Sequence, residues 1–259
     1  MQKKIYFKSK DGIKLCGIWN MPVKNTNKAV ILAHGITVDK NEDGVFTGLA
    51  KLLSDHGYAV LRFDFRGHGE SQGQSIDMTI KGEILDIEAV VKTANNTGYS
   101  DIGLVGASFG GGVAALYTVK YPKAIKCLCL WNPCLDYNHC FLNPTLPWLI
   151  KKKDMMKEDL ERQGWTTLGS RKFILGKKLF SEMAKLHPNK EIKKIKKPLV
   201  IIHGDKDTYV PYNDSKQSLK NIFNGRLVTI KNGEHGFHEP KKHATIANKE
   251  TLRFFQKYL

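Results

Sequence analysis

The chain has 259 residues, of which 41% are apolar and 25% are charged, and 41 lysines and arginines against 25 aspartates and glutamates give a formal net charge of +16. A chain of this length and apolar content can bury roughly 70–75% of its unfolded surface, which excludes a disordered chain and a disulfide-dependent miniprotein. No apolar run reaches 18 residues, and the basic N-terminus lacks the apolar stretch of a secretory signal, so we expect neither a transmembrane helix nor a signal peptide.

Cysteine usage and charge distribution bear on location and partners. The five cysteines form no C-x-x-C pair, and Cys127 and Cys129 alternate within an apolar run, as reduced core thiols do; we therefore expect a cytoplasmic protein. Residues 151–200 carry 15 basic and 6 acidic side chains, a net charge of +9. Lysine dominates this excess, without the interleaved arginines and aromatic residues of a nucleic-acid groove, so no nucleic-acid partner is expected.

Apolar runs alternate with helical patterns along most of the chain, which is typical of parallel βαβ units. The first two predicted strands flank Asp11-Gly12, a turn dipeptide, and should form an antiparallel hairpin. The elements predicted for the first half are strands at residues 3–9, 14–21, 29–33, 58–63, 102–105 and 125–130, and helices at 45–56, at 79–94 and from the glycine-rich stretch 106–112 to Tyr121.

The alternation breaks between residues 131 and 197. This stretch contains four prolines, clustered lysines and amphipathic pieces without a clear strand partner. The pattern resumes with strands at 198–203 and 226–230 and helices at 212–223 and 240–258. We therefore expect one α/β domain, formed by residues 1–130 and 198–259, with residues 131–197 inserted as a cap or lid.

The strongest chemical motif is Gly106-Ala107-Ser108-Phe109-Gly110, which fits G-x-S-x-G between an apolar strand and a helix. Small neighbours allow a sharp strand-to-helix turn that lifts the serine hydroxyl to a helix N-terminus, where free N–H groups favour developing negative charge. A glycine-rich packing turn or a phosphate loop is the alternative, but no Lys-Ser or Lys-Thr pair follows, as a P-loop requires. The motif predicts that Ser108 is a nucleophile.

A nucleophilic serine needs a histidine base and an acid that orients it. His235 follows the last predicted strand in a loop that can reach the carboxyl edge of the sheet, and His238 is the second candidate. Asp207 follows the penultimate strand and reaches further into the site than Asp205, which is expected to cap the turn. The predicted order of nucleophile, acid and base along the chain is the one expected for a serine on a G-x-S-x-G elbow in an α/β domain.

An oxyanion hole requires two backbone donors. The N–H of Phe109, directly after the nucleophile, is one candidate, and the N–H of Ile36 in the loop His34-Gly35-Ile36-Thr37 is the other. We expect His34 to brace that loop rather than to act in catalysis. No metal-ligand spacing is present, because His235 and His238 lack the further partners of a closed site.

These motifs resemble those of α/β-hydrolase fold serine hydrolases over nearly the whole chain, and most resemble bacterial carboxylesterases of the cinnamoyl or feruloyl esterase type. The matching segments are His34-Gly35 and residues 64–71, 106–111, 203–211 and 234–236. The resemblance implies an α/β-hydrolase fold with a mostly parallel eight-stranded sheet flanked by helices. It also implies Ser108 as nucleophile, Asp207 as acid, His235 as base, and the N–H groups of Ile36 and Phe109 as the oxyanion hole. The elbow departs from the Gly-His-Ser-Gln-Gly usual in those esterases.

We therefore expect a cofactor-independent serine carboxylesterase for small to medium acyl esters, with hydroxycinnamoyl esters among the candidates. Alternatives are an acyl-CoA thioesterase, since the basic insertion could bind CoA phosphates, a monoacylglycerol lipase, a small peptidase, a non-catalytic binding protein, or a membrane-surface binder through residues 151–200. A homodimer is one possible assembly. Six apolar residues could line an acyl or aryl pocket or form the core of the cap itself: Trp131, Phe141, Leu142, Leu146, Trp148 and Leu149.

Overall fold

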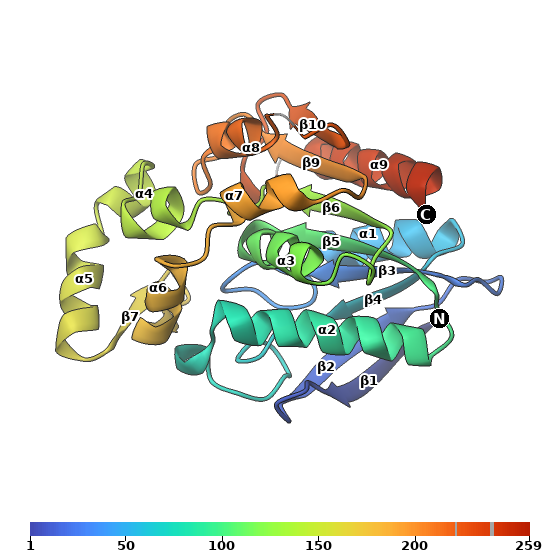
Figure 1. Ribbon diagram of the computed structural model, residues 1–259, viewed down its shortest axis with the longest axis horizontal. Coiled ribbons are helices and arrows are strands. Elements are labelled where there is room, and N and C mark those ends of the chain that lie inside the picture. The colour runs from blue at the N-terminus through green and yellow to red at the C-terminus, as the bar shows by residue number, and fades with distance from the viewer. Residues whose placement is uncertain (221, 239–240) are drawn as a thin grey trace.

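The computed structural model describes residues 1–220, 222–238 and 241–259. Within these residues, eight strands form one sheet in the order β1-β2-β4-β3-β5-β6-β9-β10 (Figure 1). β2 pairs antiparallel with β1 and β4, and the remaining pairs are parallel. The predicted mostly parallel eight-stranded sheet is thus confirmed. The strands are β1 (Gln2–Lys8), β2 (Lys14–Asn20), β3 (Lys28–Ala33), β4 (Ala59–Phe63), β5 (Asp101–Ala107), β6 (Cys127–Trp131), β9 (Leu199–Gly204) and β10 (Gly225–Ile230).

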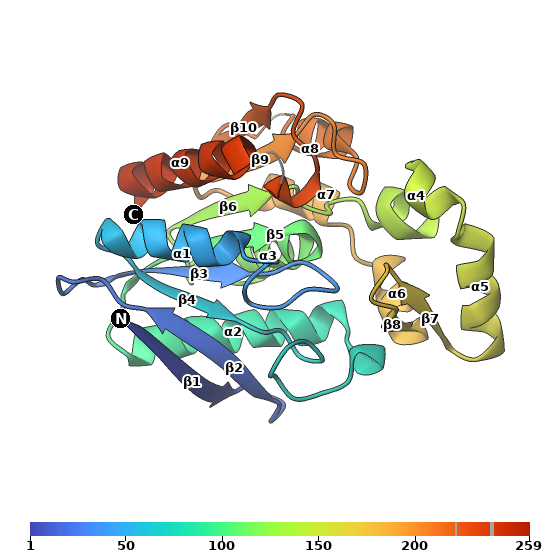
Figure 2. The same ribbon diagram turned by 180° about the vertical axis from the view of Figure 1, so that it is seen from behind.

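Helices cover both faces of this sheet. Figures 1 and 2 show α2 and α3 on one face and α1 and α9 on the other. The core divides accordingly, because side chains along a strand alternate between faces: Ile31 of β3 packs on the α2–α3 side, whereas Val30 and Leu32 pack on the α1–α9 side. The helices are α1 (Val45–Asp55), α2 (Ile80–Asn96), α3 (Ser108–Lys120), α8 (Tyr212–Ser218) and α9 (Lys241–Tyr258).

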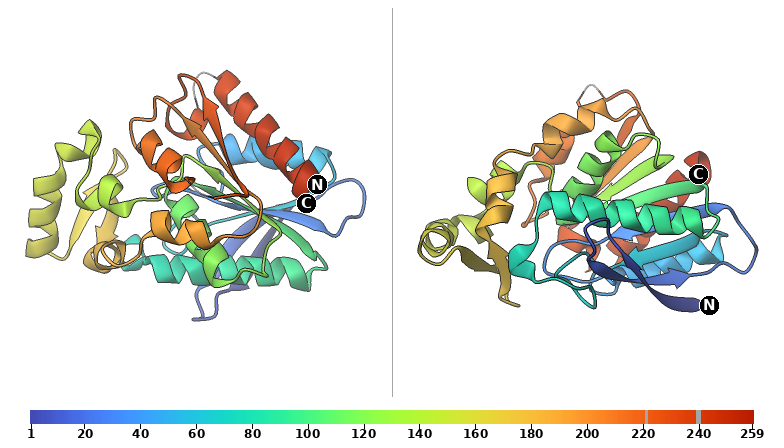
Figure 3. Two further views of the ribbon diagram at one scale, coloured as in Figure 1. Left: turned by 45° about the horizontal axis from the view of Figure 1, so that its top comes forward. Right: turned by 60° about the horizontal axis from the view of Figure 1, so that its bottom comes forward.

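The chain between β6 and β9 projects beyond the carboxyl ends of the parallel strands (Figure 3). Its strands β7 and β8 pair with each other in a separate antiparallel hairpin, so this segment does contain a strand pair that its sequence pattern did not reveal. Its elements are α4 (Pro147–Ile150), α5 (Lys153–Arg162), β7 (Trp165–Leu168), β8 (Phe173–Gly176), α6 (Lys177–Met183) and α7 (Pro188–Glu191).

Most element bounds differ from the predicted ones by one or two residues. The predicted helix over 212–223 ends earlier, at Ser218, and its residue 221 lies outside the described residues, as does residue 240, the predicted start of the last helix. The chain also contains short helical segments at Ser75–Asp77, Asn138–Leu142, Ile192–Lys194 and His235–Phe237. In the described part of the chain, no helix is long and apolar enough to cross a membrane.

Candidate active site

Ser108 stands where β5 passes directly into α3, and its backbone is in the left-handed region with φ 49°. The turn closes because the residues two positions before and after Ser108 are glycines. A β-carbon on Gly106 would lie 2.7 Å from the β-carbon of Ala114, and one on Gly110 would overlap the carbonyl oxygen of His34. The strained turn presents the Ser108 hydroxyl at the N-terminus of α3, towards the loop that follows β3.

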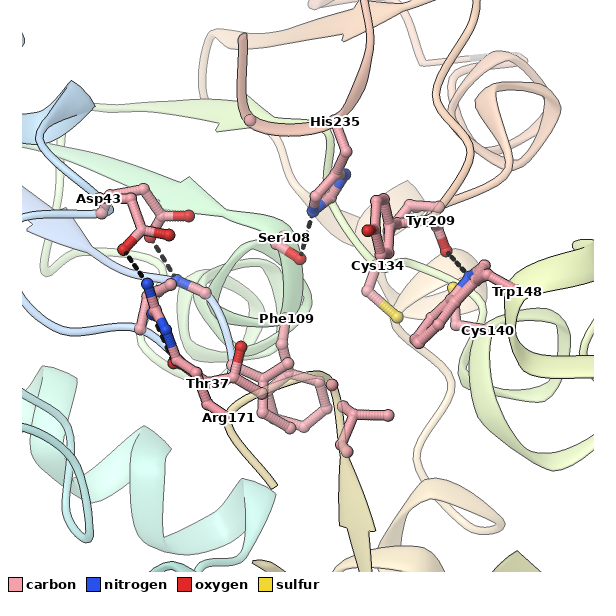
Figure 4. Close-up of a pocket in the computed structure, with 18 of the residues that line it drawn as sticks. Thr37, Asp43, Ser108, Phe109, Cys134, Cys140, Trp148, Arg171, Tyr209 and His235 are labelled. Atoms are coloured by element: carbon pink, nitrogen blue, oxygen red, sulfur yellow. Dashed lines mark hydrogen bonds and ion pairs between the residues drawn. The ribbon is translucent and has the colours of Figure 1, made fainter. Parts of the chain in front are cut away.

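The structure brings the three predicted triad residues into one chain of hydrogen bonds. The Oγ of Ser108 lies 3.0 Å from the Nε2 of His235 (Figure 4). The Nδ1 of His235 lies 2.7 Å from the Oδ2 of Asp207. Asp205, the alternative acid, instead accepts a hydrogen bond from the N–H of Asn232 and so holds the loop before His235. Because a carboxylate accepts the Nδ1–H, the Nε2 of the neutral imidazole is left to accept the serine proton.

Asp207 is buried and held by several donors. Its Oδ1 accepts the N–H groups of Tyr209 and Val210, each at 2.8 Å, and the Nε2 of His203 lies 3.1 Å from its Oδ2. Burial alone would raise the pKa of Asp207, but the charge of His235 and the hydrogen bonds from His203 and His235 outweigh burial and hold this pKa below its ordinary value. The carboxylate therefore stays ionised beside the imidazole.

The opposite balance applies to His235. Burial lowers its pKa, but the neighbouring Asp207 carboxylate, by charge and by hydrogen bond, raises it above the ordinary histidine value. An imidazole with a raised pKa is a stronger base for a serine hydroxyl. His238, the second candidate, also lines the pocket, but the hydrogen bond to Ser108 comes from His235.

The loop after β3 lies against the nucleophile. A β-carbon on Gly35 would lie 3.0 Å from the β-carbon of Ser108, and both Ile36 and Phe109 border the same pocket as Ser108. The Nδ1–H of His34 donates to the carbonyl of Gly35 at 2.7 Å, while its Nε2 accepts the N–H of Phe65 at 3.0 Å. Burial lowers the pKa of His34 to about 4, so this histidine braces the loop as a neutral side chain.

A pocket of about 330 Å³ opens over Ser108. One wall is apolar, formed by Phe109, Phe141, Trp148, Leu168 and Val210. Two of the six residues predicted to line a pocket, Phe141 and Trp148, belong to its lining.

The other four candidates, Trp131, Leu142, Leu146 and Leu149, are not among the residues that line this pocket. Trp131 is buried among the side chains between the sheet and α9, where its indole donates to Thr251 at 2.9 Å. It borders a separate small cavity that Ser108 also lines. Leu146 precedes α4, and its carbonyl accepts the N–H groups of Leu149 and Ile150. Leu142 and Leu149 pack with the core instead.

Several pocket residues were not identified from the sequence, and three of them bear on the chemistry of the site. Glu42 is buried beside Gly35, and Arg171 reaches the pocket from the turn between β7 and β8. The ring of Tyr209 lies near that of His235, with centroids 5.5 Å apart and the two planes tilted by 42°. Figure 4 shows Arg171 bridging to Asp43 and Thr37. No motif marks Glu42 or Arg171, because each reaches the site through loop geometry rather than through a fixed spacing, and Tyr209 lies in the matching segment 203–211 but had no role assigned to it.

Among the described residues, one group has metal-ligand proximity: Cys16, Asp64 and Glu70, whose ligand atoms lie within 4.8 Å of one another. The ammonium of Lys40 already lies 2.7 Å from Asp64 and 3.0 Å from Glu70. This lysine supplies the positive charge that the buried carboxylate needs, and the cluster is explained as an ion pair that anchors the loop after β3.

The fold and this arrangement define an α/β hydrolase with a serine at its nucleophile elbow. The profile of the serine aminopeptidase S33 family matches residues 24–241, and the chain belongs to that family. Est1E from Butyrivibrio proteoclasticus, in a structure titled "Ferulic Acid bound to Est1E", is 26% identical with a TM-score of 0.80, and the match covers 97% of this chain and 99% of that one.

Two further similarities lie at lower identity. A monoacylglycerol lipase from Mycolicibacterium smegmatis is 24% identical over 77% of this chain and 76% of its own length. The Pyrococcus furiosus esterase Pf2001 is 23% identical with a TM-score of 0.78, covering 100% of this chain and 91% of that chain. Together with the family match, these findings confirm the predicted class, the serine α/β-hydrolase esterase and lipase group.

Proposed function

We propose that this protein is a carboxylesterase that hydrolyses small to medium acyl esters through an acyl-enzyme on Ser108. The observation that carries the proposal is the hydrogen-bonded series from Ser108 through His235 to Asp207 at 3.0 and 2.7 Å. The volume of about 330 Å³ supports the size limit, because it lies at the lower end of the roughly 300–1,000 Å³ range of small-molecule pockets.

In the proposed reaction, Ser108 attacks the ester carbonyl while the Nε2 of His235 takes its proton. The oxygen of the tetrahedral intermediate accepts hydrogen bonds from the N–H groups of Ile36 and Phe109. The imidazolium, stabilised by Asp207, then protonates the leaving alcohol, and the carbonyl re-forms as the acyl-enzyme. Water, activated by His235, attacks this intermediate, and Ser108 regains its proton as the acid leaves.

The inserted residues 131–197 are proposed to act as a cap over this site. They contribute Phe141, Trp148 and Leu168 to the apolar wall, where an acyl or aryl group of the substrate would pack. The ferulic acid bound to Est1E makes hydroxycinnamoyl esters one class to test. A cytoplasmic location and a homodimer stay predictions from the sequence.

The test compares p-nitrophenyl butyrate hydrolysis by the wild-type protein and by Ser108→Ala, with Ser181→Ala as the matched control. Ser181 is exposed on α6, where its hydroxyl donates to the carbonyl of Lys177, and it is not among the residues that line the pocket, so its loss should leave kcat nearly unchanged. We expect Ser108→Ala to lose at least about 10³ in kcat. Equal rates in wild type and Ser108→Ala would overturn the nucleophile assignment.

The same assay series separates the alternatives. Methyl ferulate, a monoacylglycerol, an acyl-CoA and an aminoacyl p-nitroanilide are compared by kcat/KM. A preference for the acyl-CoA, with a kcat/KM that falls as ionic strength rises, would identify the protein as a thioesterase rather than an esterase, because the basic cap would then bind the CoA phosphates. Cleavage of the anilide alone would replace it by a peptidase.

A further inference from the structure

Glu42 is a buried acid that the proposed triad does not use. Its side chain is 7% exposed, and it lies in the loop between β3 and α1. Its Oε2 accepts the N–H of Gly35 at 2.7 Å. Gly35 immediately precedes Ile36 and packs against Ser108, so this hydrogen bond fixes the backbone that would present the Ile36 donor.

The backbone around Glu42 is bent into an unfavourable conformation. Glu42 has φ 47° and Asp43 has φ 49°, and both are followed by Gly44 at φ 93°. Non-glycine residues rarely adopt the left-handed region, and two in succession are retained where the surrounding structure demands them. The turn sends the Glu42 carboxylate inward to Gly35 and the Asp43 carboxylate outward to Arg171 at 2.6 Å.

Glu42 also faces the catalytic groups directly. It borders the main pocket together with Ser108 and His235, and these three residues meet again around a cavity of about 10 Å³ behind the serine, which Asn132 helps to enclose. The imidazole of His235 therefore has the Asp207 carboxylate bound at Nδ1 and a second carboxyl group, that of Glu42, within electrostatic reach.

The charges around Glu42 come from three parts of the structure. Asp39 and Asp43 lie on its own loop, His235 approaches from the loop after β10, and Arg171 of the inserted segment pairs with Asp43. Burial raises the pKa of Glu42 to about 7; the Gly35 N–H and the charge of His235 lower it, and the two aspartates raise it. Glu42 thus changes charge in the same pH range in which a histidine base does.

We propose that Glu42 is a positioning residue of this active site, which holds the loop carrying the Ile36 donor through Gly35 and links its own ionisation to that of His235. The inference rests on the proposed function. An ionised Glu42 stabilises the imidazolium, and a neutral Glu42 favours the free base. Because the two groups interact, their protons leave in two steps that belong to the pair.

Three variants separate the two roles. Glu42→Gln keeps an oxygen acceptor for Gly35 but removes the charge, so we expect a smaller fall in kcat than in Glu42→Asp, and an acid limb of kcat/KM that moves down by about half to one pH unit. Glu42→Asp keeps the charge but is too short to hold Gly35, so we expect kcat to fall about tenfold with the limb in place. Glu234→Gln removes an exposed acid next to His235 and should change neither quantity.

The pH profiles are measured with p-nitrophenyl butyrate, and the titration of His235 is followed by NMR in protein labelled with ¹³C-histidine, with the signal assigned by its loss in His235→Asn. The NMR titration needs no turnover, so it distinguishes failure of this inference from failure of the esterase assignment. A His235 titration and acid limb that are unchanged in Glu42→Gln would overturn the electrostatic link. Unchanged kcat in Glu42→Asp would overturn the positioning role.

Discussion

At the scale of single residues, the site depends on how closely the backbone of the elbow approaches the loop after β3. Ser108 holds a left-handed backbone conformation at φ 49°, which is costly for a residue with a side chain, and the strain is maintained by packing on both sides. Gly110 lies against the carbonyl of His34. The elbow and the loop after β3, which carry the two proposed oxyanion donors, can approach this closely because Gly110 has no side chain.

This contact predicts the effect of adding one methyl group. Gly110→Ala should destabilise the protein by about 1–3 kcal/mol or more, because the new β-carbon overlaps the His34 carbonyl and must push the loop away. Esterase activity should fall more than the folded fraction does. Urea unfolding and kcat are measured on the same preparation.

Gly48→Ala serves as the control, since it adds the same methyl group inside α1. The nearest atom to its new β-carbon, the Nδ2 of Asn248, is 3.9 Å away. We expect Gly48→Ala to raise the free energy of unfolding by about 0.4–1 kcal/mol, because alanine favours the helix. Equal stability changes in the two variants would contradict the packing argument.

At the scale of elements, the turn between β7 and β8 links the inserted segment to the core. Arg171 in this turn donates to the carbonyl of Thr37 at 3.0 Å and to Asp43 at 2.6 Å. Thr37 adjoins Ile36, so the β7–β8 hairpin contacts the loop after β3 on one side of Ile36, and Glu42 binds Gly35 on the other side. Both partners of the ion pair are largely exposed, at 55% and 43%, so its contribution is modest and sensitive to salt.

Arg171→Met should therefore loosen the pocket rim without damaging the fold. We expect KM for p-nitrophenyl butyrate to rise by up to about fivefold, with little change in the melting temperature, because exposed pairs contribute up to about 1 kcal/mol. The control, Arg162→Met, breaks an exposed pair with Asp159 on α5 that is remote from the pocket lining. A KM that is identical in both variants and wild type would contradict a role for the hairpin in substrate binding.

The elements also explain which predictions were possible from sequence. The alternation of buried strands with helices, together with G-x-S-x-G, specified the sheet and brought Ser108, Asp207 and His235 together, since loops after parallel strands share one edge. Trp131 was misplaced because of strand parity. It ends β6 two residues after Cys129 and four after Cys127, and alternate residues of a strand face the same side. All three side chains therefore face α9, away from the pocket.

The inserted segment was harder to predict for a physical reason. β7 and β8 have four residues each, too few for a clear alternation, and they pair only with one another. Glu42 and Arg171 reach the site through a left-handed turn and a hairpin tip, conformations set by tertiary contacts rather than by local propensity. Their roles could therefore be found only in three dimensions.

At the scale of the whole molecule, buried groups that titrate in opposite senses shape the dependence of stability on pH. Burial lowers the pKa of His34 to about 4 and that of His68 to about 3, so unfolding takes up protons below the ordinary histidine value of 6.5 and stability falls. Burial raises the pKa of Glu42 to about 7 and that of Glu83 well above its ordinary value, so stability rises as pH falls towards 4.5. The two effects oppose each other between pH 6.5 and 4.5.

We therefore expect the wild-type melting temperature to change little from pH 6.5 to 4.5 and to fall steeply below it, where the glutamates no longer compensate. Glu83→Gln should reveal the contribution of Glu83 to the dependence of stability on pH. Glu83 is 1% exposed and lies among Asp86, Arg66 and Glu182, and its glutamine variant has no proton to gain in folding. Its stability advantage over wild type should grow by about 1.4 kcal/mol per pH unit from pH 4.5 to 7.

Calorimetric unfolding from pH 4 to 7 measures this difference. Glu158→Gln, which removes an exposed glutamate on α5, provides the control and should run parallel to wild type at every pH. An advantage of Glu83→Gln that does not change with pH would mean that Glu83 is ionised in the folded protein. In that case a cation must stabilise its carboxylate, and Arg66 is the positive group that lowers the pKa of Glu83. Substituting Arg66 by methionine should then make the advantage of Glu83→Gln depend on pH.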